Sequence, residues 1–462
     1  MEQTTAKKNK YEIDMCNGTI MDKLISFSLP LMLSGILQLM FNAVDIIVVG
    51  RFSGSQALAA VGSTSALINV FTNLFIGISL GANVLTARFY AAGREKEVSE
   101  TVHTAITLAL ISGIVMALVG LVFSRGALAL MGTPDDVIGL SALYMRIYFL
   151  GMPFFMLYNY GAAILRAVGD TTRPLLFLMI AGVINACLNM VLVIVFKLGV
   201  AGVAIATVIS QMISCMLVLR CLCRSESSYR LRFSELGMKG YYLKQIFSVG
   251  VPAGIQSTVI NFSNVLLQSS VNSFGSTAMA GYTAANNLLG FLYVSVNSIT
   301  QACMSFTSQN YGVGKLKRMD RVLADCMILS VVVAVVLGCI CYGFGPEILQ
   351  IYTEDAEVIA CGMEILAYTT ITYFLCGWMD LFPGALRGMG YSAVPMVLSV
   401  IGTVGTRVVW IFGIFPYHRS LAILFISYPA SWIITIVLQV ICFYFVRRRV
   451  HRRSQALAGQ EA

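Results

Sequence analysis

Charged side chains are scarce in this sequence. Asp, Glu, Lys and Arg together make up 11% of its 462 residues, whereas soluble domains usually carry about 25%. Hydrophobic residues make up 58%, and the mean hydropathy is +0.81. Apolar runs follow one another from Leu24 almost to Val446, and each is long enough to cross a bilayer core of about 30 Å. The composition excludes a soluble protein and indicates an integral membrane protein without a sizeable soluble domain.

Patterns typical of catalysis and metal binding are also missing. The sequence has no nucleotide-binding loop and no nucleophile triad, and its 3 histidines fall near the ends of apolar runs or in the C-terminal tail. The 12 cysteines are scattered, and the closely spaced Cys221 and Cys223 have no second cluster to complete a zinc site. We therefore expect no enzyme, no cofactor and no zinc-type metal centre, with the cysteines packing as small apolar residues.

The first 20 residues lack the short apolar core and the cleavage site of a signal peptide, so we expect the first apolar run to remain in the mature protein. Lipid leaves the backbone only helices or closed barrels, and continuously apolar runs do not alternate as barrel strands do. The sequence therefore predicts an all-α integral membrane fold. Charges and Gly/Pro clusters divide the runs into twelve transmembrane helices at 24–50, 56–86, 98–123, 137–164, 174–196, 200–221, 246–273, 277–306, 322–345, 357–382, 395–416 and 420–446.

Lys and Arg are distributed unevenly between the predicted loops. Most of the 31 fall on the side that holds the N-terminus, and only Arg51, Arg125, Lys197 and Arg419 fall opposite. Because cytoplasmic loops are enriched in Lys and Arg, both termini are expected to be cytoplasmic in a multi-pass protein of the cell membrane. The same bias explains the net charge of +9 and the basic C-terminal tail, so no nucleic-acid partner is needed.

The two halves of the sequence repeat at an offset of 221 residues. Matching residues in equivalent positions are Arg166, Gly169 and Pro174 against Arg387, Gly390 and Pro395. Pro30 and Pro252 differ by 222, as one inserted residue would produce. With six helices per repeat, both copies cross the membrane in the same sense. This parallel internal repeat predicts two six-helix lobes around a central cavity, an arrangement suited to alternating access.

The predicted domains follow from the repeat and from a polar, basic segment between its copies. They are a cytoplasmic N-terminal segment (1–23), an N-lobe (24–221), a cytoplasmic linker (222–245), a C-lobe (246–446) and a cytoplasmic basic tail (447–462).

Five charged residues fall well inside predicted spans rather than near span ends: Asp45, Arg146, Glu364, Asp380 and Arg407. A charge at membrane depth costs at least about 2.5–3.5 kcal/mol on insertion scales, so those that persist usually face a cavity and a partner. Asp45 could form an ion pair with Arg146, and Asp380 could pair with Arg407 or be solvated. Glu364 and Asp380 lie sixteen residues apart on one predicted helix, so they should point in different directions and not act as a dyad.

Polar residues recur at helical spacing in the first helix of each half and in the second helix. This spacing places each set on one helix face, where it could line water or merely join helices by hydrogen bonds. The matched stripes favour the cavity. The candidate cavity and substrate residues are Gln38, Asn42, Asn69, Asn73, Asn261, Asn264, Gln268, Asp380 and Glu364. Asp45 continues the first stripe, and a lone buried carboxylate is suited to bind H⁺ or Na⁺ because its bare charge loses hydration.

Four segments resemble the multidrug and toxic compound extrusion (MATE) family. They are FNAVDIIVVGRFSGSQALAAVG (41–62), RAVGDTTRPLLFLMI (166–180), INACLNMVLVIVFKLGVAGVAIATVISQ (184–211) and RGMGYSAVP (387–395). The likeness covers essentially the whole chain. It implies a twelve-helix, two-lobe antiporter that exports organic, often cationic, compounds in exchange for Na⁺ or H⁺.

The resemblance also implies an ion-coupling site in the N-lobe. Asp45 matches the acidic residue of the first helix, and the residues that would complete the site are Asn185, Asn189 and Thr207. Asn189 departs from the family, because an Asp is usual there. The site would keep its shape but lose one carboxylate, which leaves H⁺ and Na⁺ both open as the coupling ion.

In the C-lobe, some members of the family carry a Glu early in the seventh helix that serves a second ion site. The matching neighbourhood here reads Ile260, Asn261 and Asn264, so that site should be absent or altered.

The expected partners are small organic substrates and membrane lipid, and we expect a monomer. A second hypothesis, a flippase for a lipid or a lipid-linked precursor, remains open, because related bundles present a cationic cavity to large anionic substrates.

Overall fold

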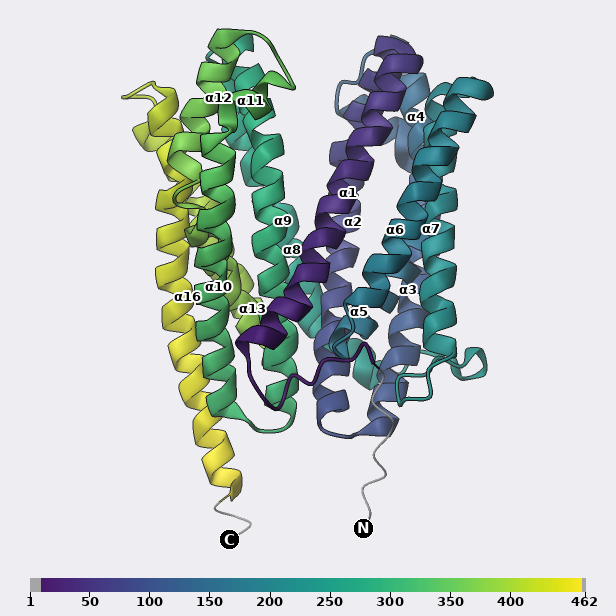
Figure 1. The fold of residues 1–462 in the computed structure, drawn as a ribbon, viewed down its shortest axis with the longest axis vertical. Coiled ribbons are helices and arrows are strands. Elements are labelled where there is room, and N and C mark those ends of the chain that lie inside the picture. Colours follow the sequence, from purple (N-terminus) through teal and green to yellow (C-terminus); the bar gives the residue numbers. More distant parts are fainter. Residues whose placement is uncertain (1–9, 459–462) are drawn as a thin grey trace. The chain divides into compact units, whose positions relative to one another are not determined.

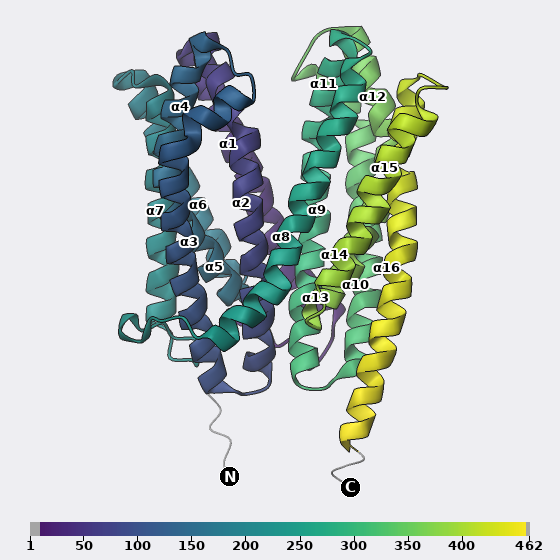
Figure 2. The ribbon, with the colours of Figure 1, turned by 180° about the vertical axis from the view of Figure 1, so that it is seen from behind.

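The computed structural model describes residues 10–458, and this part of the chain contains helices and no strands (Figures 1 and 2). The helices of the first repeat are α1 (Met21–Phe52), α2 (Gly54–Ala91), α3 (Glu95–Leu130), α4 (Asp135–Leu150), α5 (Met152–Ala167), α6 (Thr172–Asn189) and α7 (Gly199–Cys223). Those of the second are α8 (Gly240–Asn272), α9 (Ser276–Gly312), α10 (Leu316–Gly343), α11 (Gly345–Gln350), α12 (Ala356–Thr369), α13 (Tyr373–Gly388), α14 (Ala393–Ser399), α15 (Thr406–Val409) and α16 (Leu421–Ala458).

Eight of these helical segments are long and apolar enough to cross a membrane, and two bent pairs raise the number to ten. The more polar α8 and α9 have 33 and 37 residues, and with them the described chain provides the twelve helices that the sequence predicts. The predicted all-α fold is thus confirmed, and the chain is a multi-pass membrane protein. The last helix runs further than predicted, through part of the basic tail, where Arg447 pairs with Asp320 at 2.6 Å.

Two of the predicted helices are broken. α4 and α5 meet at 47°, and Pro153, which has no N–H to bond to the preceding turn, stands in the first turn of α5. α12 and α13 meet at 51°. The prediction of one helix carrying both Glu364 and Asp380 was therefore wrong, because Glu364 lies in α12 and Asp380 in α13.

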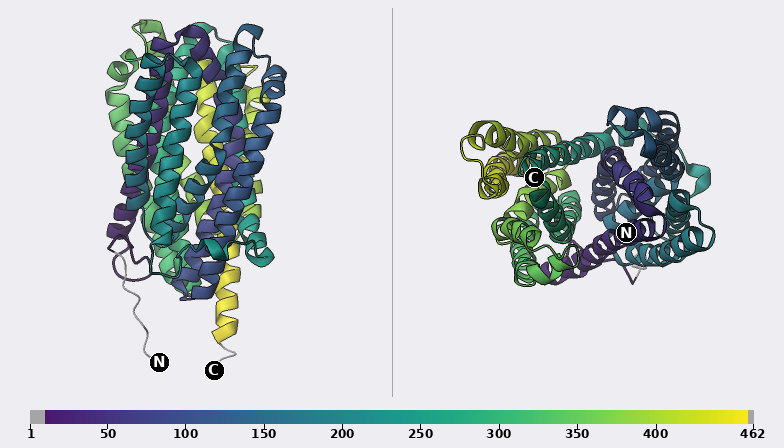
Figure 3. Two further views of the ribbon diagram at one scale, coloured as in Figure 1. Left: turned by 90° about the vertical axis from the view of Figure 1, so that its right-hand side faces the viewer. Right: turned by 90° about the horizontal axis from the view of Figure 1, so that it is seen from above.

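The chain folds into two compact units, and each forms its own helical bundle (Figure 3). Unit 1 comprises residues up to Ile13 and Leu33–Gly254, and unit 2 comprises Asp14–Met32 and residues from Ile255 onward. The boundaries cut α1 and α8, in each case just after a proline inside the helix, Pro30 or Pro252. Each of these helices thus contributes to both units. The domain boundaries expected from the sequence follow chain order and remain predictions.

Glycines allow α2 and the first half of α8 to approach closely within unit 1. A Cβ added at Gly77 would lie 2.3 Å from the Cα of Gly254, and one at Gly81 would lie 2.2 Å from the carbonyl oxygen of Ile246. A Cβ at Gly250 would lie 2.4 Å from the Cα of Ile78. The two glycines of each helix are four residues apart and share one face, the spacing at which membrane helices bring their backbones together. This contact explains why residues 240–254 belong to unit 1.

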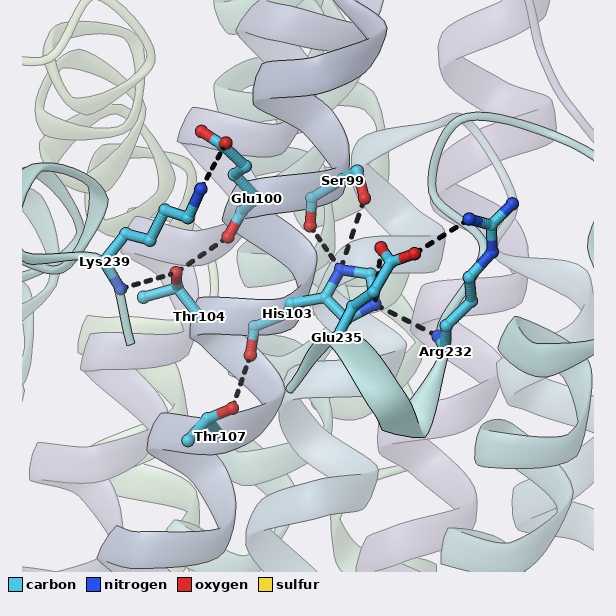
Figure 4. Close-up of polar contacts among 8 residues, drawn as sticks. All are labelled: Ser99, Glu100, His103, Thr104, Thr107, Arg232, Glu235 and Lys239. Atoms are coloured by element: carbon cyan, nitrogen blue, oxygen red, sulfur yellow. Dashed lines mark hydrogen bonds and ion pairs between the residues drawn. The ribbon is translucent and has the colours of Figure 1, made fainter. Parts of the chain in front are cut away.

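The segment between the repeats is also part of unit 1, where it packs against α3 (Figure 4). His103 is 4% exposed, and its Nε2 accepts a hydrogen bond from the backbone N–H of Arg232 at 3.0 Å. Its Nδ1 lies 2.7 Å from the carbonyl oxygen of Ser99, which can only accept, so Nδ1 is the donor in this contact. Lys239 forms an ion pair with Glu100 one turn before His103. Residues 232–239 are thereby fixed to α3.

Glu235 lies beside this contact, in a short 3₁₀ turn (Phe233–Glu235). Arg232 donates a hydrogen bond to it at 2.8 Å, and this bond lowers the pKa of the Glu235 carboxyl. Its other oxygen lies 3.9 Å from Nε2 of His103.

His103→Ala is expected to loosen the segment 230–239. The substitution removes the acceptor of the partly buried hydrogen bond from the Arg232 N–H, and a hydrogen bond of this kind contributes about 0.5–1.5 kcal/mol. Because proteases cut segments that open locally, we expect tryptic cleavage at Arg230 and Arg232 to become about tenfold faster. Limited proteolysis of the purified protein, with fragments assigned by mass spectrometry, measures this rate. His451→Ala, near the C-terminal end of α16, is the control, and equal cleavage rates in both variants would contradict the docking role of His103.

Candidate functional site

A polar cluster in unit 1 surrounds Asp45, whose side chain comes from α1 and is 9% exposed. Asn189 on α6 donates an amide hydrogen bond to Oδ1 of Asp45 and another, at 3.1 Å, to Oδ1 of Asn185. The hydroxyl of Thr207 on α7 donates to Oδ2 of Asp45 at 3.3 Å and accepts from Nδ2 of Asn185 at 3.5 Å. The structure thus brings together all four residues that the sequence singled out for the coupling site.

The hydroxyl of Thr207 has two acceptors within reach. Its oxygen is 3.3 Å from Asp45 and 3.0 Å from the carbonyl oxygen of Val203, one turn back in α7. Since a hydroxyl donates only one proton, it can serve Asp45 or its own helix but not both fully. Thr207 can therefore change its hydrogen bond when the charge on Asp45 changes.

Close packing of α1 on α6 positions the cluster. A Cβ added at Gly182 would lie 1.8 Å from the ring of Phe41, so the ring sits directly on the backbone of α6. Asp45 follows Phe41 by one turn and Asn185 follows Gly182 by nearly one turn, so the same contact places the two side chains together. Immediately after Asn189, the helix widens into a π-helical turn (η1, Met190–Val195), a feature that often accompanies functional sites.

Asp45 is hydrogen-bonded among the described residues only to the neutral side chains of Asn189 and Thr207. Arg146, the cation that could have paired with it, lies exposed on α4, and the pair does not form in the described part of the chain. Oδ1 of Asn189 is buried and has no hydrogen-bond partner. A carboxylate, two amide oxygens and a hydroxyl are the ligands that hard cations such as Na⁺ prefer, and the carboxylate alone can take a proton. Within residues 10–458, no group of three or more His, Cys, Asp or Glu side chains could hold a metal ion.

The other cavity candidates lie along the faces of their helices. Those that are exposed are Gln38 and Asn42 on α1, Asn69 on α2, and Asn261 and Gln268 on α8. Those that are partly buried are Asn73 on α2, Asn264 on α8, Glu364 on α12 and Asp380 on α13. Among the described residues, none of the unit 1 candidates (Gln38, Asn42, Asn69 and Asn73) is hydrogen-bonded to Asp45.

Unit 2 contains a buried cation, Arg407, whose surroundings the sequence did not predict. The ion pair with Asp380, one of the two alternatives that the sequence left open, does not form among the described residues. Nη1 of Arg407 instead donates to Oδ1 of Asn264 at 2.7 Å and to the hydroxyl of Ser263 at 3.3 Å. The guanidinium carbon lies 4.7 Å from the ring centre of Tyr428 on α16. The polar spacing along α8 marked Asn264 as a candidate, whereas no sequence pattern marked Ser263 or Tyr428.

Comparison with known proteins gives concordant matches. The MatE family model matches residues 30–191 and 252–412, two ranges that follow the internal repeat. The chain is 32% identical over 434 residues to the probable multidrug resistance protein YoeA of Bacillus subtilis, covering 92% of this chain and 93% of the relative. It is 22% identical to the multidrug export protein MepA of Staphylococcus aureus, covering 82% and 84% of the two chains.

Solved structures share the fold. One is a MATE protein in complex with MaL6, with a TM-score of 0.88 and 20% identity over 97% of this chain and all of that one. Another is the outward-facing conformation of a multidrug resistance MATE family transporter, with a TM-score of 0.87 and 19% identity over the same shares. At these identities, the likeness concerns the arrangement of the helices.

Proposed function

Because the chain belongs to the MatE family of transporters, we propose that it is an antiporter that exports organic compounds in exchange for H⁺ or Na⁺ by alternating access. Relatives described as multidrug resistance and multidrug export proteins support organic compounds as the cargo. We further propose that the cargo is cationic or amphipathic. The transporter would act as a monomer in the cell membrane with both termini in the cytoplasm, as the distribution of Lys and Arg indicates.

The observation that carries ion coupling is the environment of Asp45. The carboxylate is buried within a membrane-spanning helix, receives hydrogen bonds from Asn189 and Thr207, and has no cationic partner among the described residues. A charge so placed is costly, and uptake of H⁺ or Na⁺ relieves the cost. Asp45 would therefore take the ion on the side where it is abundant and release it on the other.

Asn185, Asn189 and Thr207 orient the carboxylate in this scheme. Asn189 holds Oδ1 of Asp45, and its own buried Oδ1 is free to contact a cation. Proton uptake by Asp45 removes the charge that Thr207 faces, and its hydroxyl can then return to Val203. Exchange of one such ion for one cationic cargo moves no net charge, so the concentration gradient of the ion drives uphill export, with about 1.4 kcal/mol for each tenfold difference.

Proteoliposomes that contain the purified protein test the proposal. Transport of the cationic dye ethidium is followed by fluorescence under an imposed pH gradient, an imposed Na⁺ gradient, or neither. We expect uphill movement of the dye with at least one gradient and only equilibration without them. Failure of both gradients to drive the dye would contradict the antiporter, and it is the result expected of a lipid flippase, which labelled-lipid translocation in the same vesicles would detect.

A further inference from the structure

Arg407 is a charged residue of the transmembrane region for which the proposed ion coupling has no use. It lies in α15, between two π-helical turns (η3, Val400–Gly405, and η4, Trp410–Ile414), and is 3% exposed. Arginine keeps its charge in proteins, so this position of unit 2 is permanently cationic.

All the groups that contact this cation are neutral. The amide oxygen of Asn264 and the hydroxyl of Ser263 share Nη1, and the ring of Tyr428 covers the guanidinium plane. Tyr428 is itself fixed by a 3.1 Å hydrogen bond to the hydroxyl of Tyr282. These contacts orient the guanidinium without neutralising it, and no ion pair between Arg407 and an acidic side chain occurs in the part of the chain that the structure describes.

The unused side of the guanidinium faces away from these partners. Nε of Arg407 is buried without a hydrogen-bond partner, and the hydrogen bonds that Arg407 makes to the described residues all come from Nη1. Nε and Nη2 are the two parallel donors with which arginine binds both oxygens of a carboxylate. An unpaired charge inside a membrane protein is costly and usually marks a functional site, so the missing partner is expected to be an anion.

An approach to this position exists along α8. Asn264 is only partly buried, and Asn261 and Gln268, at spacings of three and four, are exposed on the same face of the helix. The polar side chains of this helix face thus extend to Asn264, the residue that accepts the 2.7 Å hydrogen bond from Arg407.

The internal repeat relates the surroundings of Arg407 in unit 2 to those of Asp45 in unit 1. Asn264 is the repeat equivalent of Asn42, which lies one turn from Asp45 on α1, at the offset of 222 that also relates Pro252 to Pro30. Arg407 lies one residue after the equivalent of Asn185 at the offset of 221. Equivalent regions of the repeat thus carry a buried acid in unit 1 and a buried base in unit 2.

We propose that Arg407, held by Ser263, Asn264 and Tyr428, binds the carboxylate of organic substrates, so that the transporter accepts zwitterionic compounds. This inference rests on the proposed export of organic compounds and adds a negatively charged group to the cargo. Arg407 binds one carboxylate oxygen through Nε and the other through Nη2, and the ring of Tyr428 keeps the guanidinium plane fixed.

Equilibrium binding of two matched dyes to the purified full-length protein tests the site. Rhodamine B carries a free carboxylate and is zwitterionic at neutral pH, and its ethyl ester is a cation with the same ring system. Fluorescence anisotropy without any ion gradient gives the Kd of each. We expect the wild type to bind rhodamine B about tenfold more tightly than the ester, equivalent to about 1.4 kcal/mol. In Arg407→Gln this preference should disappear, because the Kd of rhodamine B rises while that of the ester stays within about twofold.

Two further variants complete the design. Arg146→Gln removes an exposed arginine of α4 and should leave both Kd values unchanged, and Arg407→Lys, which keeps the charge but not the paired donors, should be intermediate. Equal binding of the two dyes by the wild type, a comparison that needs no variant to fold, would overturn the anion site alone. Binding of neither dye would contradict the proposed organic cargo and the anion site together.

Discussion

Asp45→Asn is expected to reduce gradient-driven transport by more than tenfold. Asparagine has nearly the same shape as aspartate, and it can keep the contacts with Asn189 and Thr207. Asparagine cannot bind a proton at neutral pH and offers no charge to Na⁺, so the ion gradient can no longer drive transport. Initial rates of ethidium transport in proteoliposomes, with and without a gradient, measure the effect.

The control must separate coupling from loss of a negative charge in general. Asp136→Asn, at an exposed position in the first turn of α4, removes the same charge and should transport like the wild type. Asn185→Ala should retain part of the coupled rate, because Asp45 keeps its two donors. Wild-type rates in Asp45→Asn would exclude this carboxylate as the coupling group, whichever ion the wild type uses.

Gly77→Ala is expected to destabilise unit 1 strongly, although it adds only one methyl group. The new Cβ would lie 2.3 Å from Cα of Gly254, a distance that atoms cannot adopt, and its neighbour is backbone that cannot rotate away. α2 and α8 would have to separate, and overpacking of this kind costs about 1–3 kcal/mol, occasionally more. Since each kcal/mol lowers Tm by about 2–4 °C, we expect Tm to fall by about 5–10 °C.

Thermal unfolding of the detergent-purified protein, followed by size-exclusion chromatography after heating, measures this shift. Gly62→Ala is the matched control, because Gly62 lies in the same helix with nothing within 4 Å of an added Cβ. It should be neutral or stabilising by about 0.5–1 kcal/mol, since alanine favours the helix over glycine. Similar Tm values for the two variants would mean that α2 and α8 do not pack through Gly77.

The sequence predicted those features that depend on local pattern. Apolar runs of sufficient length located the helices, and the offset between Arg166 and Arg387 revealed the repeat. The bends at Gly151 and after Thr369 were not predicted, because each interrupts a run that stays apolar throughout. The exchange of the first halves of α1 and α8 between the units was also not predicted, because it depends on which backbones can approach, here through Gly77 and Gly254.

The surroundings of Asp45 and of Arg407 could likewise be predicted only where they depend on spacing within one helix. Asn185 and Asn189 share a helix face by their spacing, so their proximity to each other follows from the sequence. Their proximity to Asp45 was expected only from the resemblance to a family. The sequence left Asp380 either paired with Arg407 or solvated. Packing decides against the pair, because the side chain of Arg407 reaches Asn264 and the ring of Tyr428.

The division of α8 between the units has a consequence for synthesis. Unit 1 includes residues 240–254, which are translated after the last helix of the first repeat. When α7 leaves the ribosome, the glycine face of α2 at Gly77 and Gly81 still lacks the partner that it meets in the finished protein. The first repeat cannot therefore complete its fold alone, and the nascent chain must begin the second repeat before the first compact unit closes.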